Sequence, residues 1–106
     1  VMSDGSLDNA GASSEGGRVY IQATALTLGG YTNMQIKLQE SSDDGVGDAW
    51  ADVTGATSTA ITTVPASEVL TIAAGTTIER YTRALLVLNG SGSGESITAL
   101  VALARD

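Results

Sequence analysis

The stretch NMQIKLQE, residues 33–40, indicates the fold most directly, because apolar and polar side chains alternate along it without a break. Met34, Ile36 and Leu38 fall on one side of an extended chain, and polar residues occupy the positions between them. A strand with one buried face has this period of two, whereas a helix repeats its apolar residues at intervals of three and four. Residues 33–40 are therefore predicted to form a half-buried β-strand.

Strand-like stretches continue on both sides of this segment, separated by Gly, Asn, Asp or Pro, and no segment carries a helical stripe. The further predicted strands are residues 18–28, 50–53, 60–64, 68–72, 78–88 and 96–104. About seven short strands predict an all-β fold, an antiparallel β-sandwich. The Cys–Trp–Cys spacing of antibody domains is absent, so only the architecture favours an Ig-like or jelly-roll-like arrangement.

The longest predicted strand, residues 78–88, is apolar on both faces in its second half, where Leu85 and Val87 alternate with Leu86 and Leu88. A strand without a polar face is typical of the centre of a packed sheet. Nearer the start of the strand, Arg83 is expected to be solvated or to pair with a carboxylate on a neighbouring strand, and contact with a partner subunit is the alternative.

The first 17 residues are small, polar and acidic, with almost no side chains to bury. This composition predicts a flexible linker or N-terminal arm over residues 1–17, followed by a β-sandwich domain over residues 18–106. Because the chain begins with Val1, we expect it to be a fragment of a longer protein or a processed product.

Composition excludes several classes of function. The chain has 106 residues and neither His nor Cys, which removes a Cys/His triad, a zinc site with N and S ligands, and disulfides. A formal net charge of −7 disfavours nucleic acid and anionic membranes as partners. No apolar run approaches the roughly 20 residues of a membrane-spanning helix. We therefore expect no enzymatic activity, no cofactor, no nucleic-acid partner and no membrane insertion.

The turn SSDDGVGD, residues 41–48, carries the weak metal candidates Asp43, Asp44 and Asp48. Carboxylate oxygens suit calcium, but the ligand spacing of an EF-hand is not followed. Asp44 and Gly45 also form a favourable tight-turn pair. A solvated turn is therefore the preferred interpretation.

Tyr31 and Trp50 are the candidate surface-binding residues, since an exposed aromatic ring can stack on a sugar. A lone Trp in a chain without Phe more often anchors the core, and this is the preferred interpretation for Trp50. Tyr20 and Tyr81 are also expected in the core. Tyr31 follows two glycines and is expected to be the most exposed tyrosine.

Four segments occur in an order that resembles a known family. They are GGRVYIQATALT (16–27), MQIKLQESSDDGVGDAWADVTGAT (34–57), TIERYTRALLVLNG (77–90) and SITALVALAR (96–105). The order and spacing are similar to a recurrent β-sandwich domain of tailed-phage virion proteins, over roughly residues 9–106. This domain stands at the C-terminus of siphophage tail tube proteins and is related to decoration domains. The resemblance assigns roles in fold and packing to Trp50, Asp52, Arg80, Tyr81 and Arg83.

The resemblance implies a phage virion structural protein, made in the cytoplasm of the host bacterium and located in the virion. As an accessory domain on the outside of the tail tube, it would contact other tail or capsid subunits. Many weak contacts with host cell-surface glycans would add up through multivalency. A capsid decoration (cement) protein and a carbohydrate-binding module are the alternatives.

Overall fold

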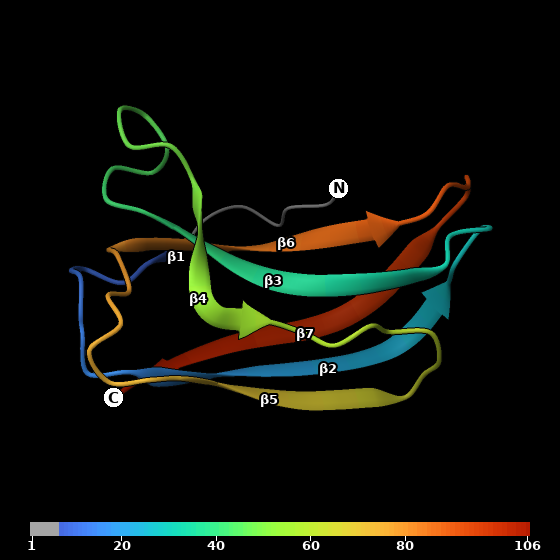
Figure 1. Cartoon of the computed structure of the whole chain (residues 1–106), viewed down its shortest axis with the longest axis horizontal. Coiled ribbons are helices and arrows are strands. Elements are labelled where there is room, and N and C mark those ends of the chain that lie inside the picture. Colours follow the sequence, from blue (N-terminus) through green and yellow to red (C-terminus); the bar gives the residue numbers. More distant parts are fainter. Residues whose placement is uncertain (1–6) are drawn as a thin grey trace.

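Two antiparallel sheets contain all seven strands of this computed structural model, which describes residues 7–106. The strands are β1 (Leu7–Asp8), β2 (Gly17–Thr27), β3 (Asn33–Ser41), β4 (Ala51–Thr57), β5 (Ala66–Ile72), β6 (Tyr81–Asn89) and β7 (Ser96–Arg105). The larger sheet has the order β1-β6-β3-β4 and the smaller one β5-β2-β7, and Figure 1 shows the two layers. The predicted all-β antiparallel sandwich is confirmed. Within residues 7–106, no helix has the length and hydropathy needed to cross a membrane.

Aliphatic side chains from both sheets fill the space between the layers. The alternation predicted for residues 33–40 is confirmed, because Met34, Ile36 and Leu38 are all buried. They belong to one cluster with Val19 and Ile21 of β2. Each fully buried aliphatic side chain of this size contributes roughly 1.5–3 kcal/mol, which replaces the aromatic mass that the composition lacks.

The chain after β3 departs from the predicted strands. The strand predicted over residues 50–53 is longer than expected, because β4 extends to Thr57. Of the expected strand 60–64, only Ile61 pairs, in a bridge with Met34. The ladder between β3 and β4 shifts register between Lys37 and Gln39. The chain therefore follows one edge of β3 irregularly and contacts it at separate points instead of forming two clean strands.

The N-terminal segment differs from the expected flexible linker or arm. Residues 1–6 of that prediction lie outside the described residues. Of the rest, β1 pairs with β6, Ser13 bridges Ile78, and Gly17 already belongs to β2. The polar composition concealed this order, because residues 7–17 are held by backbone and side-chain hydrogen bonds and bury few apolar side chains.

Strand β6 lies between β1 and β3 and not at the end of its sheet, but within residues 7–106 only its first two residues have a paired neighbour on both sides. The pairs β2–β5 and β3–β6 match the B–E and C–F pairs of an Ig sandwich. Strand β7, however, pairs with β2, whereas the last strand of an Ig sandwich lies beside β6. On the side away from β3, β6 is paired only at Tyr81 and Thr82, by β1. Among the described residues, most of β6 is therefore an edge strand.

Candidate functional site

Asp43 organises the loop between β3 and β4, residues 42–50, which we call the acidic loop. Its carboxylate accepts backbone N–H groups of Val46, Gly47 and Asp48 at 3.1, 2.7 and 2.9 Å, and the Ser41 hydroxyl at 3.3 Å. The N–H bonds from Asp48 and Gly47 hold the pKa of Asp43 below its ordinary value. This carboxylate acts as an internal anchor for the loop.

The other two metal candidates do not join Asp43 in a ligand set. Asp48 accepts the Ser42 N–H at 2.8 Å, and Asp44 lies in the turn with φ of 62°. Within residues 7–106, no group of three or more acidic side chains could hold a metal ion. Asp44 and Gly45 both have positive φ, as a type I′ turn requires. The structure therefore agrees with the turn interpretation of these residues.

Trp50 lies on the outer face of the larger sheet and not in the core cluster, so the preferred interpretation as a core anchor was wrong. It is half-buried, and the Arg83 guanidinium lies 4.6 Å from the ring centroid. A Cβ added to Gly45 would collide with the indole nitrogen, so the acidic loop also lies against the ring. These contacts reduce the area of the ring that a sugar could reach.

A chain of polar contacts continues from Arg83 across three strands. Arg83 of β6 donates to the Gln39 side-chain oxygen at 2.9 and 2.7 Å, and the Gln39 amide nitrogen donates to Asp52 at 3.0 Å. Lys37 also donates to Asp52 at 3.0 Å. The bond from Gln39, followed by that from Lys37, lowers the pKa of Asp52. Arg83 thus pairs through an amide, and not directly with the expected carboxylate.

The tyrosines are arranged differently from the prediction. Tyr31 is half-buried in the turn between β2 and β3, at the end of the sandwich opposite the acidic loop and Trp50 (Figure 1). The most exposed tyrosine is Tyr20, at 43%, and with Val69 and Leu100 it forms an apolar patch on the outer face of the smaller sheet. Tyr31 and Trp50 therefore do not form one binding site.

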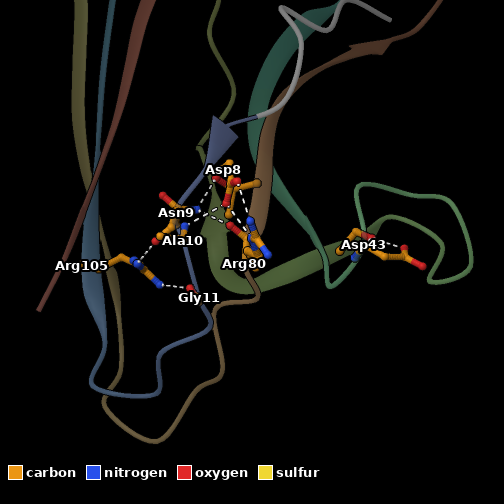
Figure 2. Close-up of polar contacts among 9 residues, drawn as sticks. Asp8, Asn9, Ala10, Gly11, Asp43, Arg80 and Arg105 are labelled. Carbon is orange, nitrogen blue, oxygen red and sulfur yellow. Dashed lines mark hydrogen bonds and ion pairs between the residues drawn. The ribbon is translucent and has the colours of Figure 1, made fainter.

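A second polar cluster fastens the N-terminal segment, as Figure 2 shows. Arg80 donates to both carboxylate oxygens of Asp8, at 2.8 and 2.9 Å. These bonds, with the Ala10 N–H, lower the pKa of Asp8 to about 2. Arg105 of β7 donates to the carbonyls of Gly11 and Asn9 at 2.6 and 2.7 Å. The cluster links the segment to both sheets.

An open groove of 590 Å³ runs between β6 and β7, where the two sheets do not meet edge to edge. Its lining is mainly aliphatic and includes Leu38, Leu86, Ala99 and Val101. We call it the β6–β7 groove. The sequence showed that both strands are apolar, but the groove depends on β7 pairing with β2 instead of β6, which no local pattern encodes.

Comparison with known proteins returned no relative. No family model matches the chain, and no match was found among curated proteins or solved structures.

The charged residues described above share one role, which is to form structural hydrogen bonds and ion pairs. Asp8, Asp43, Asp52, Arg80 and Arg83 bond to backbone groups or to neighbouring side chains, in contacts that hold loops and strands.

Proposed function

We propose that the chain is a non-catalytic accessory domain of a tailed-phage virion, displayed on the outside of the tail tube. The observation that carries this proposal is the use of its charged side chains. Asp43 holds a loop, and Arg80 and Arg105 hold the N-terminal segment. Charged side chains that hold loops and strands in place support a structural domain that presents its surfaces to other molecules. The order of sequence motifs, which resembles virion sandwich domains, supports the same function.

The arrangement of the chain suits display on a larger assembly. The described chain starts at Leu7, near the end of the sandwich where Asp106 lies, and Asp106 bonds through its N–H to Gly16 at 3.1 Å (Figure 1). The connections 28–32 and 90–95 lie at the other end, and the connection 58–65 runs to it (Figure 1). A domain tethered beside Leu7 would point these loops outward, toward host-surface glycans, while neighbouring virion subunits contact its base. Repetition around the tube would convert weak contacts into avidity.

Immunogold labelling of purified particles, from the phage or prophage whose genome carries the gene, tests this proposal. Antibody raised against the chain is expected to label tails. Labelling of capsids instead would favour the decoration (cement) alternative. The edge of β6 that residues 7–106 leave unpaired also supports this alternative, because such proteins join neighbouring subunits. Absence of the chain from particles analysed by mass spectrometry would overturn both.

The carbohydrate-binding alternative makes a separate optical prediction. Because Arg83 and the acidic loop cover part of Trp50, host cell-wall polysaccharide is expected to leave its fluorescence unchanged. A saturable change in emission that disappears in Trp50→Phe would instead favour sugar binding at this ring. The exposed Tyr20 patch offers a comparison: a change in binding confined to Tyr20→Ala would place sugar on the smaller sheet.

A further inference from the structure

The second half of β6 presents an unpaired strand edge beside the β6–β7 groove. Within residues 7–106, no strand pairs with β6 on this side beyond Thr82. An open edge is a template for another strand, and proteins commonly protect such edges with Lys, Pro or a β-bulge. Residues 84–88 read ALLVL, and their register with β3 is uninterrupted. This edge carries none of those protections.

The pairing of β3 shows which backbone groups of β6 point toward the open edge. Met34 exchanges both backbone hydrogen bonds with Ile61, at 3.1 and 2.7 Å, on the side of β3 away from β6. Leu88, opposite Met34 in the antiparallel ladder, therefore directs its own N–H and C=O away from β3. The regular alternation gives Leu86 and Ala84 the same direction. Three residues thus offer both donors and acceptors at the edge.

The side chains along this edge are apolar on both faces of the strand. Leu86 faces the core and lines the β6–β7 groove, while Leu85 and Val87 are half-buried on the outer face. A strand with one face toward water normally alternates apolar and polar residues. A partner beside β6 would therefore explain why this strand is apolar on both faces, the feature that suggested a central strand.

The distribution of charge favours a second copy of the chain as that partner. The chain carries 12 acidic residues and a net charge of −7, yet residues 80–94 contain no acid. Two copies would repel over most of their surfaces and least along this strand. Arg83, the charged residue within β6, lies near one end of the strand, so an antiparallel partner would place the two Arg83 side chains at opposite ends.

We infer that β6 pairs antiparallel with β6 of a second copy in a two-fold symmetric dimer, with Leu86 opposite Leu86. The other pairs in this register are Ala84 with Leu88, Leu85 with Val87 and Arg83 with Asn89. Each of the three edge residues then exchanges its N–H and C=O with the other copy, and no like charges stand opposite each other. Such an interface is isologous and closes on itself.

The dimer would also cover the β6–β7 grooves. A two-fold axis perpendicular to the joined sheet keeps both smaller sheets on the same side, so the two grooves face each other. Gly90, with φ of 97°, follows the last residue of β6, Asn89. This inference goes beyond the proposed function because it concerns the chain itself, whatever particle carries it.

Sedimentation equilibrium of the purified chain tests the dimer. The expected result is a concentration-dependent rise from 10.7 kDa toward twice that mass. A monomer at every concentration overturns the inference, as does a larger open-ended series. A monomer whose Ala84, Leu86 and Leu88 amides are protected from hydrogen exchange would mean that another part of the chain covers the edge, which also overturns it.

Charged variants test the register. Leu85→Glu and Val87→Lys are each expected to weaken self-association, because a charge then faces an apolar residue. The carboxylate that Leu85→Glu introduces would lie opposite Lys37 within its own sheet, which favours folding of that variant. Mixing the two variants is expected to restore a dimer, since position 85 of one copy faces position 87 of the other. Circular dichroism of each variant checks folding.

The matched control mixes Val87→Glu with Val87→Lys. These charges do not face each other in the inferred register, so no dimer should be restored. Equal restoration in both mixtures, or restoration in neither with folded variants, would overturn the register. The chain contains no Cys, so a Leu85→Cys/Val87→Cys double variant gives a direct check. Oxidation should link two copies covalently, because pairs of this non-hydrogen-bonded kind lie close enough for a disulfide.

Discussion

At the scale of single residues, short polar side chains fix the backbone of this protein where it leaves the sheets. Asp43 gathers three N–H groups of its own loop, and the buried Ser41 hydroxyl accepts the Gly45 N–H at 2.8 Å and donates to the Asp48 carbonyl at 2.7 Å. The loop in turn presses Gly45 against Trp50. The ring is therefore held in place by a loop that lacks regular secondary structure.

Gly45→Ala and Gly75→Ala separate this contact from backbone strain. Both glycines have positive φ, so each substitution should cost about 1–2 kcal/mol of unfolding free energy from the backbone alone. A Cβ at Gly75 meets open space, whereas one at Gly45 meets Trp50. Urea denaturation should show the larger loss for Gly45→Ala, which should also shift the Trp emission. Equal losses with unchanged emission would show that the loop does not press on the ring.

Glu40 gives a pH-dependent prediction. Burial raises its pKa above 4.5, and the nearby Glu79 and Asp48 carboxylates add to this, against the opposing Glu79 N–H bond. The contribution of Glu40 to the free energy of unfolding is therefore fully present below pH 4.5, where the carboxyl is protonated. It is lost as pH rises through the folded-state pKa of Glu40 and the buried group becomes charged. Glu40→Gln keeps an acceptor for the Glu79 N–H, which lies at 2.8 Å. The variant should raise the urea midpoint at pH 7 and not below pH 4.5.

Glu95→Gln is the control for the loss of one negative charge from a chain of net charge −7. If Glu95→Gln stabilises the protein as much as Glu40→Gln at pH 7, general charge repulsion explains the gain. Burial of the Glu40 carboxyl would then not be its cause.

At the scale of elements, β1 shows how a very short strand is maintained. A strand of two residues is shorter than usual, so its backbone hydrogen bonds alone do not stabilise its position in the sheet. Asp8 adds its paired bonds with Arg80, and Asn9 donates from its side chain to the Arg80 carbonyl at 3.0 Å and to Thr82 at 3.1 Å. Strand β1 therefore depends on side chains, which explains why hydrophobic periodicity did not detect it.

Acid should release β1. The folded-state pKa of Asp8, about 2, lies below its ordinary value of 3.8, so the folded state favours the ionised form. Its stabilising effect is complete above pH 3.8 and is lost as pH falls through about 2. The stability difference between wild type and Asp8→Asn, measured by urea unfolding, should shrink over this range. Exchange of the Asn9 amide, which bonds to Arg80 at 2.8 Å, should become faster in parallel.

Asp44→Asn, which removes a charge from an exposed turn, controls for net charge in the same titration. A difference between wild type and Asp8→Asn that stays constant from pH 4 to pH 2 would contradict the role of the Asp8–Arg80 pair. So would the same pH dependence in Asp44→Asn.

At the scale of the whole molecule, the N-terminal segment connects two sheets that share one aliphatic core. Strand β1 extends the larger sheet, while Arg105 of the smaller sheet holds the carbonyls of Asn9 and Gly11. At the other ends of the two sheets, β4 and β5 lie close together. Within residues 7–106, no strand pairing joins β6 to β7, so the segment links the two layers where their strands do not.

Arg105→Ala should loosen this connection. It removes two charge-assisted hydrogen bonds and should cost about 1–3 kcal/mol of unfolding free energy. Limited proteolysis should then cut within residues 9–16 before the sandwich unfolds. Arg18→Ala, at an exposed position of β2, is the matched control and should change neither measurement. Equal sensitivity of the two variants would show that Arg105 does not hold the segment.

The sequence by itself determined the layered β architecture. The period of two in residues 33–40 depends on burial of one strand face, so it predicted the core positions of Met34, Ile36 and Leu38. Glycine and aspartate pairs such as Asp44–Gly45 predicted turns, because few other residues adopt positive φ. These are local properties of the chain, and each leaves its mark within a few residues.

Only the tertiary structure decided which strands are neighbours, and that decided the candidate surfaces. Within residues 7–106, β7 pairs with β2 and no strand pairs with β6 beyond Thr82 on the side away from β3. Trp50 lies against Arg83 instead of in the core, and Asp8 meets Arg80 across 72 positions of sequence. The order of the strands depends on how well all the side chains of both sheets pack together in one core. Contacts between distant residues therefore leave no periodic pattern in either segment, and β1 and the β6–β7 groove could not be predicted from sequence.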